Sequence, residues 1–188
     1  MRELSLHVLD VVENALEAGA TRVEIEIVED SRSDRLTIRL KDNGRGMDAE
    51  TLARATDPFY TTRTTRAVGL GLPLLRAAAQ RAGGDLQVTS QPGRGTCVQA
   101  DFRLGHIDRA PLGDVRGTLW SILLSNRACS LRYTHRVDGR AFTFDTEEFR
   151  AELGDIPLTH PKVRAWLDDY LASGLAALAD EPEEDEHA

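Results

Sequence analysis

The chain lacks the excess of basic residues that a protein binding nucleic-acid backbones needs on one face. Its 23 lysine and arginine residues are outnumbered by 31 aspartate and glutamate residues, which gives the 188-residue chain a net charge of −8. The stretch 180–188 holds six of these acids and no base, so the remaining chain is nearly neutral. We therefore expect no nucleic-acid binding, and we expect 180–188 to be a disordered acidic tail.

Long apolar runs and cysteine motifs are also missing. No apolar run approaches the roughly 20 residues of a membrane span, and the amphipathic N-terminal pattern differs from a signal peptide. The two cysteines, Cys97 and Cys129, are far apart and belong to no CxxC or histidine-containing metal motif. These absences argue against membrane association, a disulfide framework and a cysteine metal site, and they predict a cytoplasmic protein.

Hydrophobic periodicity predicts helices where apolar residues recur at spacings of three and four, and strands where apolar and charged residues alternate. The predicted helices are 3–18, 48–55, 69–82, 115–126, 145–153 and 161–178. The predicted strands are 22–28, 35–41, 85–90 and 96–103, with a hairpin around Asp138-Gly139. The pattern predicts an α+β fold: a domain over 1–104 with a mainly antiparallel sheet and helices on one face, and a small α+β unit over 105–179.

Two polar residues on the first predicted helix are candidates for metal and proton chemistry. Asp10 and Asn14 are four positions apart, so they share one helix face. Asn14 offers an oxygen to a hard cation such as Mg²⁺, and Asp10 could orient or deprotonate a water or hydroxyl. The alternative is that both are solvent-facing residues of an amphipathic helix.

A turn containing two glycines follows the second predicted strand. Asp42 at the strand end could accept a hydrogen bond from an exocyclic amine, and the glycines Gly44 and Gly46 would let a flat ring approach the backbone. The alternative is a plain Asp-Asn-Gly turn, which is common.

Two further patches surround the predicted loop over 56–68. Residues 57–63 (DPFYTTR) combine a proline turn, aromatics, hydroxyls and a base, as functional loops often do. Alternatively, the aromatics only anchor the loop. Gly69 and Gly71 then open a helix, where exposed N–H groups and the helix dipole favour an anion such as phosphate. No Gly-Lys-Ser/Thr sequence follows, so the segment is not a P-loop.

In this order and spacing, the four patches resemble the N, G1, F and G2 boxes of the GHKL superfamily of gyrase, heat-shock chaperone, histidine kinase and mismatch-repair ATPases. Gly95-Thr96 before a strand is similar to the last motif of that family. The resemblance covers residues 3–103. It implies a Bergerat-type ATP-binding α/β sandwich with a mixed, mainly antiparallel sheet, and it implies ATP and Mg²⁺ as ligands.

The resemblance also implies roles for individual residues. Asn14 would ligate Mg²⁺, and Asp10 would be the catalytic carboxylate. Asp42 would bond the adenine amino group, helped through water by Thr96. The other residues of the nucleotide site would be Gly44, Gly46, Met47, Phe59, Gly69, Leu70, Gly71 and Leu72.

A lid over the nucleotide is implied as well. Phe59 and residues 60–68 would form this lid, which is short, as in kinases. Arg63 and Arg66 are predicted to neutralise phosphate charge, although the family motif does not fix these two positions.

The sequence departs from each branch of the family. In the hydrolysing branches a glutamate takes the place of Asp10, and the first box closely resembles the mismatch-repair form. Residues 57–63 and the following helix look more like histidine kinases. The first box begins at the N-terminus, which leaves no room for a helical segment with a phosphoacceptor histidine, and His7 lies in no such context. Transfer would therefore be in trans to a partner protein, as in stand-alone anti-sigma-factor serine kinases.

Three functions stay open at this point: a kinase acting on a partner, an ATP-driven switch with slow hydrolysis, and a nucleotide-sensing scaffold without turnover. The unit over 105–179 would supply the partner surface, although aromatics in a small unit commonly form its core. The aromatic candidates are Trp120, Tyr133, Phe142, Phe144 and Trp166. The sequence also leaves a homodimer open.

Overall fold

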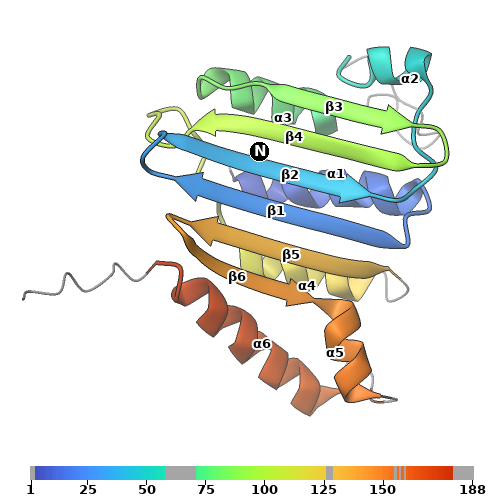
Figure 1. Ribbon diagram of the computed structural model, residues 1–188, viewed down its shortest axis with the longest axis vertical. Coiled ribbons are helices and arrows are strands. Elements are labelled where there is room, and N and C mark those ends of the chain that lie inside the picture. The colour runs from blue at the N-terminus through green and yellow to red at the C-terminus, as the bar shows by residue number, and fades with distance from the viewer. Residues whose placement is uncertain are drawn as a thin grey trace, which may run out of the picture.

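A computed structural model describes residues 3–57, 71–125, 129–154, 156, 158 and 160–179. Six strands form one sheet in the order β3-β4-β2-β1-β5-β6 (Figure 1). The strands are β1 (Arg22–Asp30), β2 (Arg35–Asp42), β3 (Leu86–Gln91), β4 (Gly95–Arg103), β5 (Ser130–Val137) and β6 (Arg140–Asp145). The helices are α1 (Leu4–Glu17), α2 (Ala49–Arg54), α3 (Gly71–Arg81), α4 (Val115–Ser125), α5 (Thr146–Leu153) and α6 (Pro161–Ala176).

The predicted α+β fold with a mixed, mainly antiparallel sheet is confirmed. Strands β1 and β5 run parallel, whereas the other four neighbouring pairs are antiparallel. Along β2, Leu36, Ile38 and Leu40 are buried while Arg39 and Lys41 are exposed. This alternation gives the sheet one apolar and one charged face. Helices α1, α3 and α4 lie behind the sheet in Figure 1, so they cover one face, as predicted.

Helix α1 lies at the centre of the helical layer, between α3 and α4. Its apolar residues recur at helical spacing and are buried in the core that the sheet and helices share. They are Leu4, Val8, Val11, Val12 and Ala15. The amphipathic pattern therefore fixes which side of α1 faces the sheet. As a consequence, the half-buried Asp10 and Asn14 lie on the flank of the helix that faces α3.

The chain after residue 104 extends the same sheet. Strand β5 lies beside β1, with Tyr133 opposite Ile25, and α6 packs against the apolar side of β6. The helix comes close at Gly174, where a Cβ would overlap the Phe142 ring. Strand β4 ends at Arg103, but the sheet continues beyond it, and the division of the chain at 104/105 stays a prediction.

Most of the aromatic candidates for a partner surface belong to the core. Tyr133, Phe142 and Phe144 are buried. The indole N–H of Trp120 donates to Asp168 at 2.8 Å, whereas Trp166 is 47% exposed. A small unit needs its large apolar side chains to form a core, which explains why these three rings are unavailable to a partner. None of the helices in the described part of the chain combines the length and the apolar character that crossing a membrane requires.

Candidate nucleotide site

The polar pair on α1 faces the first turn of α3. A Cβ built on Gly71 would lie 3.4 Å from Asn14 Nδ2 and 3.7 Å from Asp10 Cβ. Gly71 is the first residue of α3, so the helix end, whose first N–H groups have no partner within the helix, lies next to the carboxylate and the carboxamide. The first and fourth sequence patches, 57 positions apart at Asn14 and Gly71, thus meet in space. An anion at the N-terminus of α3 and a cation on Asn14 would be neighbours.

Asp42 ends β2 on the apolar side of the sheet. Its Oδ1 accepts a 2.8 Å hydrogen bond from the N–H of Gly44, and the N–H of Thr96 also bonds to the carboxylate. Burial raises the pKa of the Asp42 carboxyl above its usual range, against the opposing effect of these two N–H groups. A partly desolvated acceptor held by backbone donors is suited to bind a ligand amine.

Two glycines, Gly46 after β2 and Gly95 at the start of β4, occupy positions where no other residue would fit. Gly46 has a φ of 66°, and a Cβ there would overlap the Gln91 carbonyl oxygen. Gly95 has a φ of 85°, and its Cβ would overlap the carbonyl oxygen of Asp42. The two loops therefore touch through their backbones, which only glycine allows. This close approach holds the start of β4, and Thr96 with it, against Asp42.

Ser90 ties the same two loops together by side-chain hydrogen bonds. Its hydroxyl accepts from the N–H of Met47 at 2.8 Å and donates to the carbonyl oxygen of Gly95 at 2.9 Å. Its Oγ also lies 3.0 Å from Thr96 Oγ1. The sequence interpretation did not include Ser90. The available signal was a polar residue at an inward position of β3, where Leu86 and Val88 are apolar.

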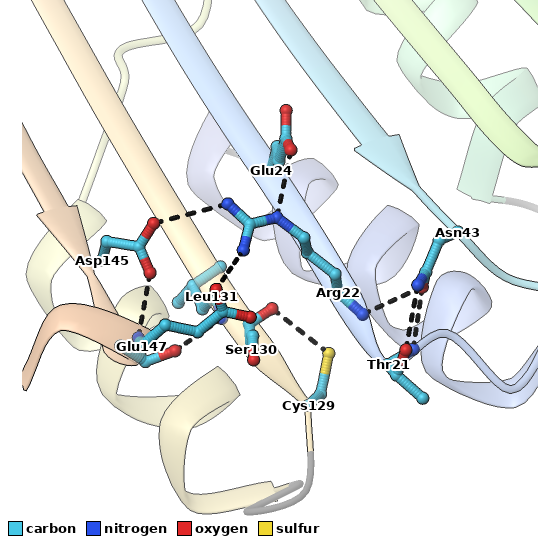
Figure 2. Close-up of polar contacts among 10 residues, drawn as sticks. Thr21, Arg22, Glu24, Asn43, Cys129, Ser130, Leu131, Asp145 and Glu147 are labelled. Carbon is cyan, nitrogen blue, oxygen red and sulfur yellow. Dashed lines mark hydrogen bonds and ion pairs between the residues drawn. The ribbon is translucent and has the colours of Figure 1, made fainter. Parts of the chain in front are cut away.

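Asn43, read from the sequence only as part of a turn, anchors the Asp42 end of the sheet. Its Oδ1 accepts from the N–H groups of Thr21 and Arg22, each at 2.9 Å, and its Nδ2 donates to Thr21 Oγ1. Figure 2 shows the Arg22 side chain continuing from there to Asp145 and Glu147, on the far side of β5. The site is therefore connected to the region after residue 105 by consecutive polar contacts.

The structure places most of the predicted residues that it describes in two groups on the helical side of the sheet. Asp10 and Asn14 meet Gly71, and Asp42, Gly44 and Thr96 form the second group. Leu72 packs against the core beside α3. Phe59, Arg63, Arg66, Gly69 and Leu70, with the rest of the predicted lid, lie outside the described residues.

The donor set suits magnesium held jointly with a ligand. In the described part of the chain, no three histidine, cysteine or acidic residues cluster to hold a metal. Mg²⁺ is commonly bound by one or two protein oxygens together with phosphate oxygens and water. Asn14 beside the α3 N-terminus provides such a partial site, so these residues fit Mg²⁺ that arrives with a nucleotide.

Comparison with known proteins assigns the family. Residues 2–106 match the family described as "Histidine kinase-, DNA gyrase B-, and HSP90-like ATPase". The match covers more than half of the chain, which therefore belongs to this family and contains an ATP-binding, histidine kinase-like ATPase domain. The superfamily resemblance found in the sequence motifs is thereby confirmed.

Two similar curated proteins are sensor kinases. The chain is 44% identical over 109 residues to the sensor protein kinase FleS of Pseudomonas aeruginosa, a match that covers 58% of this chain and 26% of FleS. It is 38% identical over 96 residues to the signal transduction histidine-protein kinase AtoS of Escherichia coli, covering 50% of this chain and 16% of AtoS. The chain thus spans about a quarter or less of these relatives' length.

A solved structure shares the fold. The crystal structure of the N-terminal domain of a DNA repair protein matches with a TM-score of 0.54 and 17% identity. The match covers 76% of this chain and 52% of that one. It therefore includes residues outside the stretch 2–106 that matches the family.

Proposed function

We propose that this protein binds Mg·ATP and passes the γ-phosphoryl group in trans to a partner protein. The observation that carries the proposal is the meeting of Asp10 and Asn14 with the first turn of α3 at Gly71. A metal-ligating amide, a carboxylate and a helix N-terminus are the groups that phosphoryl transfer requires, since its catalysis consists mainly of positioning and charge neutralisation.

Each side chain has a separate role in this proposal. Asn14 would hold Mg²⁺ with its amide oxygen, and the N–H groups at the start of α3 would receive phosphate oxygens. Asp10, one helical turn before Asn14, would orient the acceptor hydroxyl and take its proton. Asp42 would accept from the adenine amino group, which assigns the base to the group of residues around Asp42 and the phosphates to the first turn of α3.

The histidines of the described chain support a partner as the acceptor. His7 and His135 are buried, and His135 is hydrogen-bonded to Tyr133 at Nδ1 and to Glu29 at Nε2. His160 is exposed but stands before α6, at the β6 edge of the sheet. His106 is half-buried beside Gly83, past the C-terminal end of α3. Each of these four histidines is buried or lies outside the first turn of α3, so we propose a phosphoacceptor on another protein.

A second function, an ATP-driven switch, is favoured by the contacts in Figure 2. They lead from Asn43, next to Asp42, through Arg22 to Asp145 and Glu147. A nucleotide that shifts the turn after Asp42 would also shift Arg22 and, through it, Asp145 and Glu147 at the start of α5. In that case slow hydrolysis resets the state, and the region after residue 105 presents the altered surface.

Nucleotide binding and chemistry are tested separately by two variants. Asn14→Ala should abolish Mg-dependent ATP binding in calorimetric titration, because the metal loses its protein ligand. Asp10→Asn should still bind ATP but lose turnover by about 100-fold, because the proton acceptor is gone. Glu13→Gln, an exposed residue on the same helix, is the matched control and should change neither. Unchanged ATP affinity in Asn14→Ala would contradict the site.

The protein that receives the phosphoryl group is identified by incubating the full chain with γ-labelled ATP and candidate partner proteins. Label on a second protein supports the kinase. Phosphate release without a labelled protein supports the switch. If ATP binds and neither product forms, both enzymatic forms are wrong and only nucleotide sensing is left.

A further inference from the structure

The hydroxyl of Ser90 is saturated with hydrogen bonds, and their directions can be assigned. A serine hydroxyl has one proton to donate and two lone pairs to accept with. The Gly95 carbonyl oxygen, 2.9 Å away, can only accept, so it takes the Ser90 proton. The Met47 N–H, at 2.8 Å, can only donate, so it uses one lone pair of Ser90.

The remaining contact then has one possible direction. Ser90 Oγ and Thr96 Oγ1 lie 3.0 Å apart, and either could donate when considered alone. With the Ser90 proton committed to Gly95, the proton between the two hydroxyls comes from Thr96. The second lone pair of Ser90 receives it, and every polar capacity of Ser90 is then used.

Thr96 is thereby left as a hydrogen-bond acceptor toward the rest of the site. Its hydroxyl proton is held by Ser90, and its backbone N–H is held by the Asp42 carboxylate. The Asp42 carboxylate accepts hydrogen bonds from the N–H groups of Gly44 and Thr96, and it is an acceptor toward a ligand as well. This end of the site therefore offers two neighbouring acceptors to a ligand.

A pair of acceptors discriminates between nucleobases. The exocyclic amine of adenine has two N–H donors and complements both groups, whereas the carbonyl oxygen at the same position of guanine meets lone pairs with lone pairs. The preference applies to direct contact with the base, because a bridging water that donates one proton to Thr96 keeps a second proton for a guanine carbonyl. Unpaired polar groups in such a site are the strongest source of rejection.

We propose that Ser90 is a positioning residue for base selection: by holding the Thr96 proton, it fixes Thr96 as an acceptor and favours ATP over GTP. The inference rests on the proposed nucleotide function. Ser90 also ties the Met47 loop to β4, which would be a purely structural role. The two roles differ in what they predict, because loosening the loops weakens all nucleotides, whereas freeing the Thr96 proton changes the preference between them.

The test compares the affinities of ATP and GTP for the full chain, measured by displacement of a fluorescent ATP analogue. In Ser90→Ala, Thr96 can turn its proton toward the ligand and donate to a guanine carbonyl. We expect the ratio of ATP to GTP affinity to fall about tenfold, as for the loss of one hydrogen-bond preference. Thr89→Ala removes the hydroxyl of an exposed neighbour on β3 and should leave the ratio unchanged.

A double-mutant cycle shows whether Ser90 acts through Thr96. Thr96→Val removes the hydroxyl that Ser90 orients and should itself lower the ratio. Adding Ser90→Ala to Thr96→Val should then change the ratio no further. Thermal unfolding checks that each variant is folded, and if Ser90→Ala is not, Ser90→Cys provides the same test, because its sulfur is only a weak acceptor for the Thr96 proton.

The outcomes separate the two proposals. A wild-type chain that binds no nucleotide contradicts the proposed function, and the role of Ser90 falls with it. A wild-type chain that prefers ATP, with a Ser90→Ala variant that loses ATP and GTP affinity equally, leaves the function standing and overturns the role of Ser90. Independent effects of the two substitutions in the cycle also overturn it.

Discussion

His7 shows at the scale of one residue how α1 is constrained. Its side chain is 2% exposed, and among the described residues its Nδ1 has no hydrogen-bond partner. Burial, reinforced by nearby positive charge that includes Arg81, lowers the pKa of His7 to about 4. His7 is therefore neutral in the folded protein at neutral pH, and it packs as an apolar residue on the helix that carries Asp10 and Asn14.

This burial predicts a pH-dependent stability. Because the folded pKa of about 4 is below the ordinary value of 6.5, the unfolded chain takes up a proton first as the pH falls. The contribution of His7 to stability should therefore decrease below pH 6.5 and level off below about pH 4, with a total loss of about 3 kcal/mol. His7→Leu should flatten that part of the profile in urea unfolding, whereas His160→Gln, an exposed histidine, should not. An unchanged slope in His7→Leu would assign the titration to another group.

The site residues that the sequence predicted were those with a motif of their own. Asp10, Asn14 and Asp42 stand in recognisable patterns, and the structure places them beside Gly71 and Thr96. Ser90 and Asn43 act through contacts with residues distant in sequence. Spacing along the chain does not encode those contacts, so these supporting residues could only be found in three dimensions.

At the scale of elements, periodicity predicted every helix and strand of the described chain to within a few residues. The alternation in β1 and β2 also predicted which side chains face the helices. The partner of β5 could not be predicted, because alternation says which face of a strand is apolar and says nothing of its neighbour. Arg22 and Ser130, the first residues of β1 and β5, are paired in the parallel ladder. Nothing in the local sequence around either residue indicates this pairing.

Asp145, at the junction of β6 and α5, makes two contacts that should stabilise the fold. Asp145, 4% exposed, caps α5 by accepting from the N–H of Glu147 at 2.9 Å, and it also pairs with Arg22 at 3.4 Å. Asp145→Ala removes a helix cap and leaves Arg22 without one of its acids, so we expect a loss of about 2 kcal/mol in urea unfolding.

Two further variants separate these contributions. Asp145→Asn keeps a cap acceptor and should cost less than Asp145→Ala. Asp48→Ala removes the exposed cap of α2, where Asp48 accepts from Thr51, and should cost about 1 kcal/mol or less. Equal losses in Asp145→Ala and Asp48→Ala would show that the contact with Arg22 contributes nothing.

At the scale of the whole molecule, the two predicted units share one core. Ile25 and Ile27 of β1 are buried beside Tyr133 of β5 and Leu119 of α4. A chain truncated after residue 104 would expose this side of β1 and of α1 to water. Burial of apolar side chains is the main stabilising contribution to folding, so the loss should be large.

We therefore expect residues 1–104 alone to show no cooperative thermal unfolding by circular dichroism. Residues 1–179, which lack only the acidic stretch, are the control and should unfold like the full chain. Cooperative unfolding of 1–104 would instead identify it as a domain that folds on its own, at the boundary predicted from the sequence.

The position of β5 beside β1 also sets an order of events during synthesis. Strand β1 is complete at Asp30, but the strand that pairs with its outer edge begins at Ser130. A ribosome adding roughly 5–20 residues per second needs on the order of 5–20 s to make the chain between them. Through that interval the edge of β1 offers unpaired backbone groups to any strand nearby. A nascent chain is thus exposed to mispairing at β1 until β5 has been made, and a chaperone that shields this edge would raise the yield of folded protein.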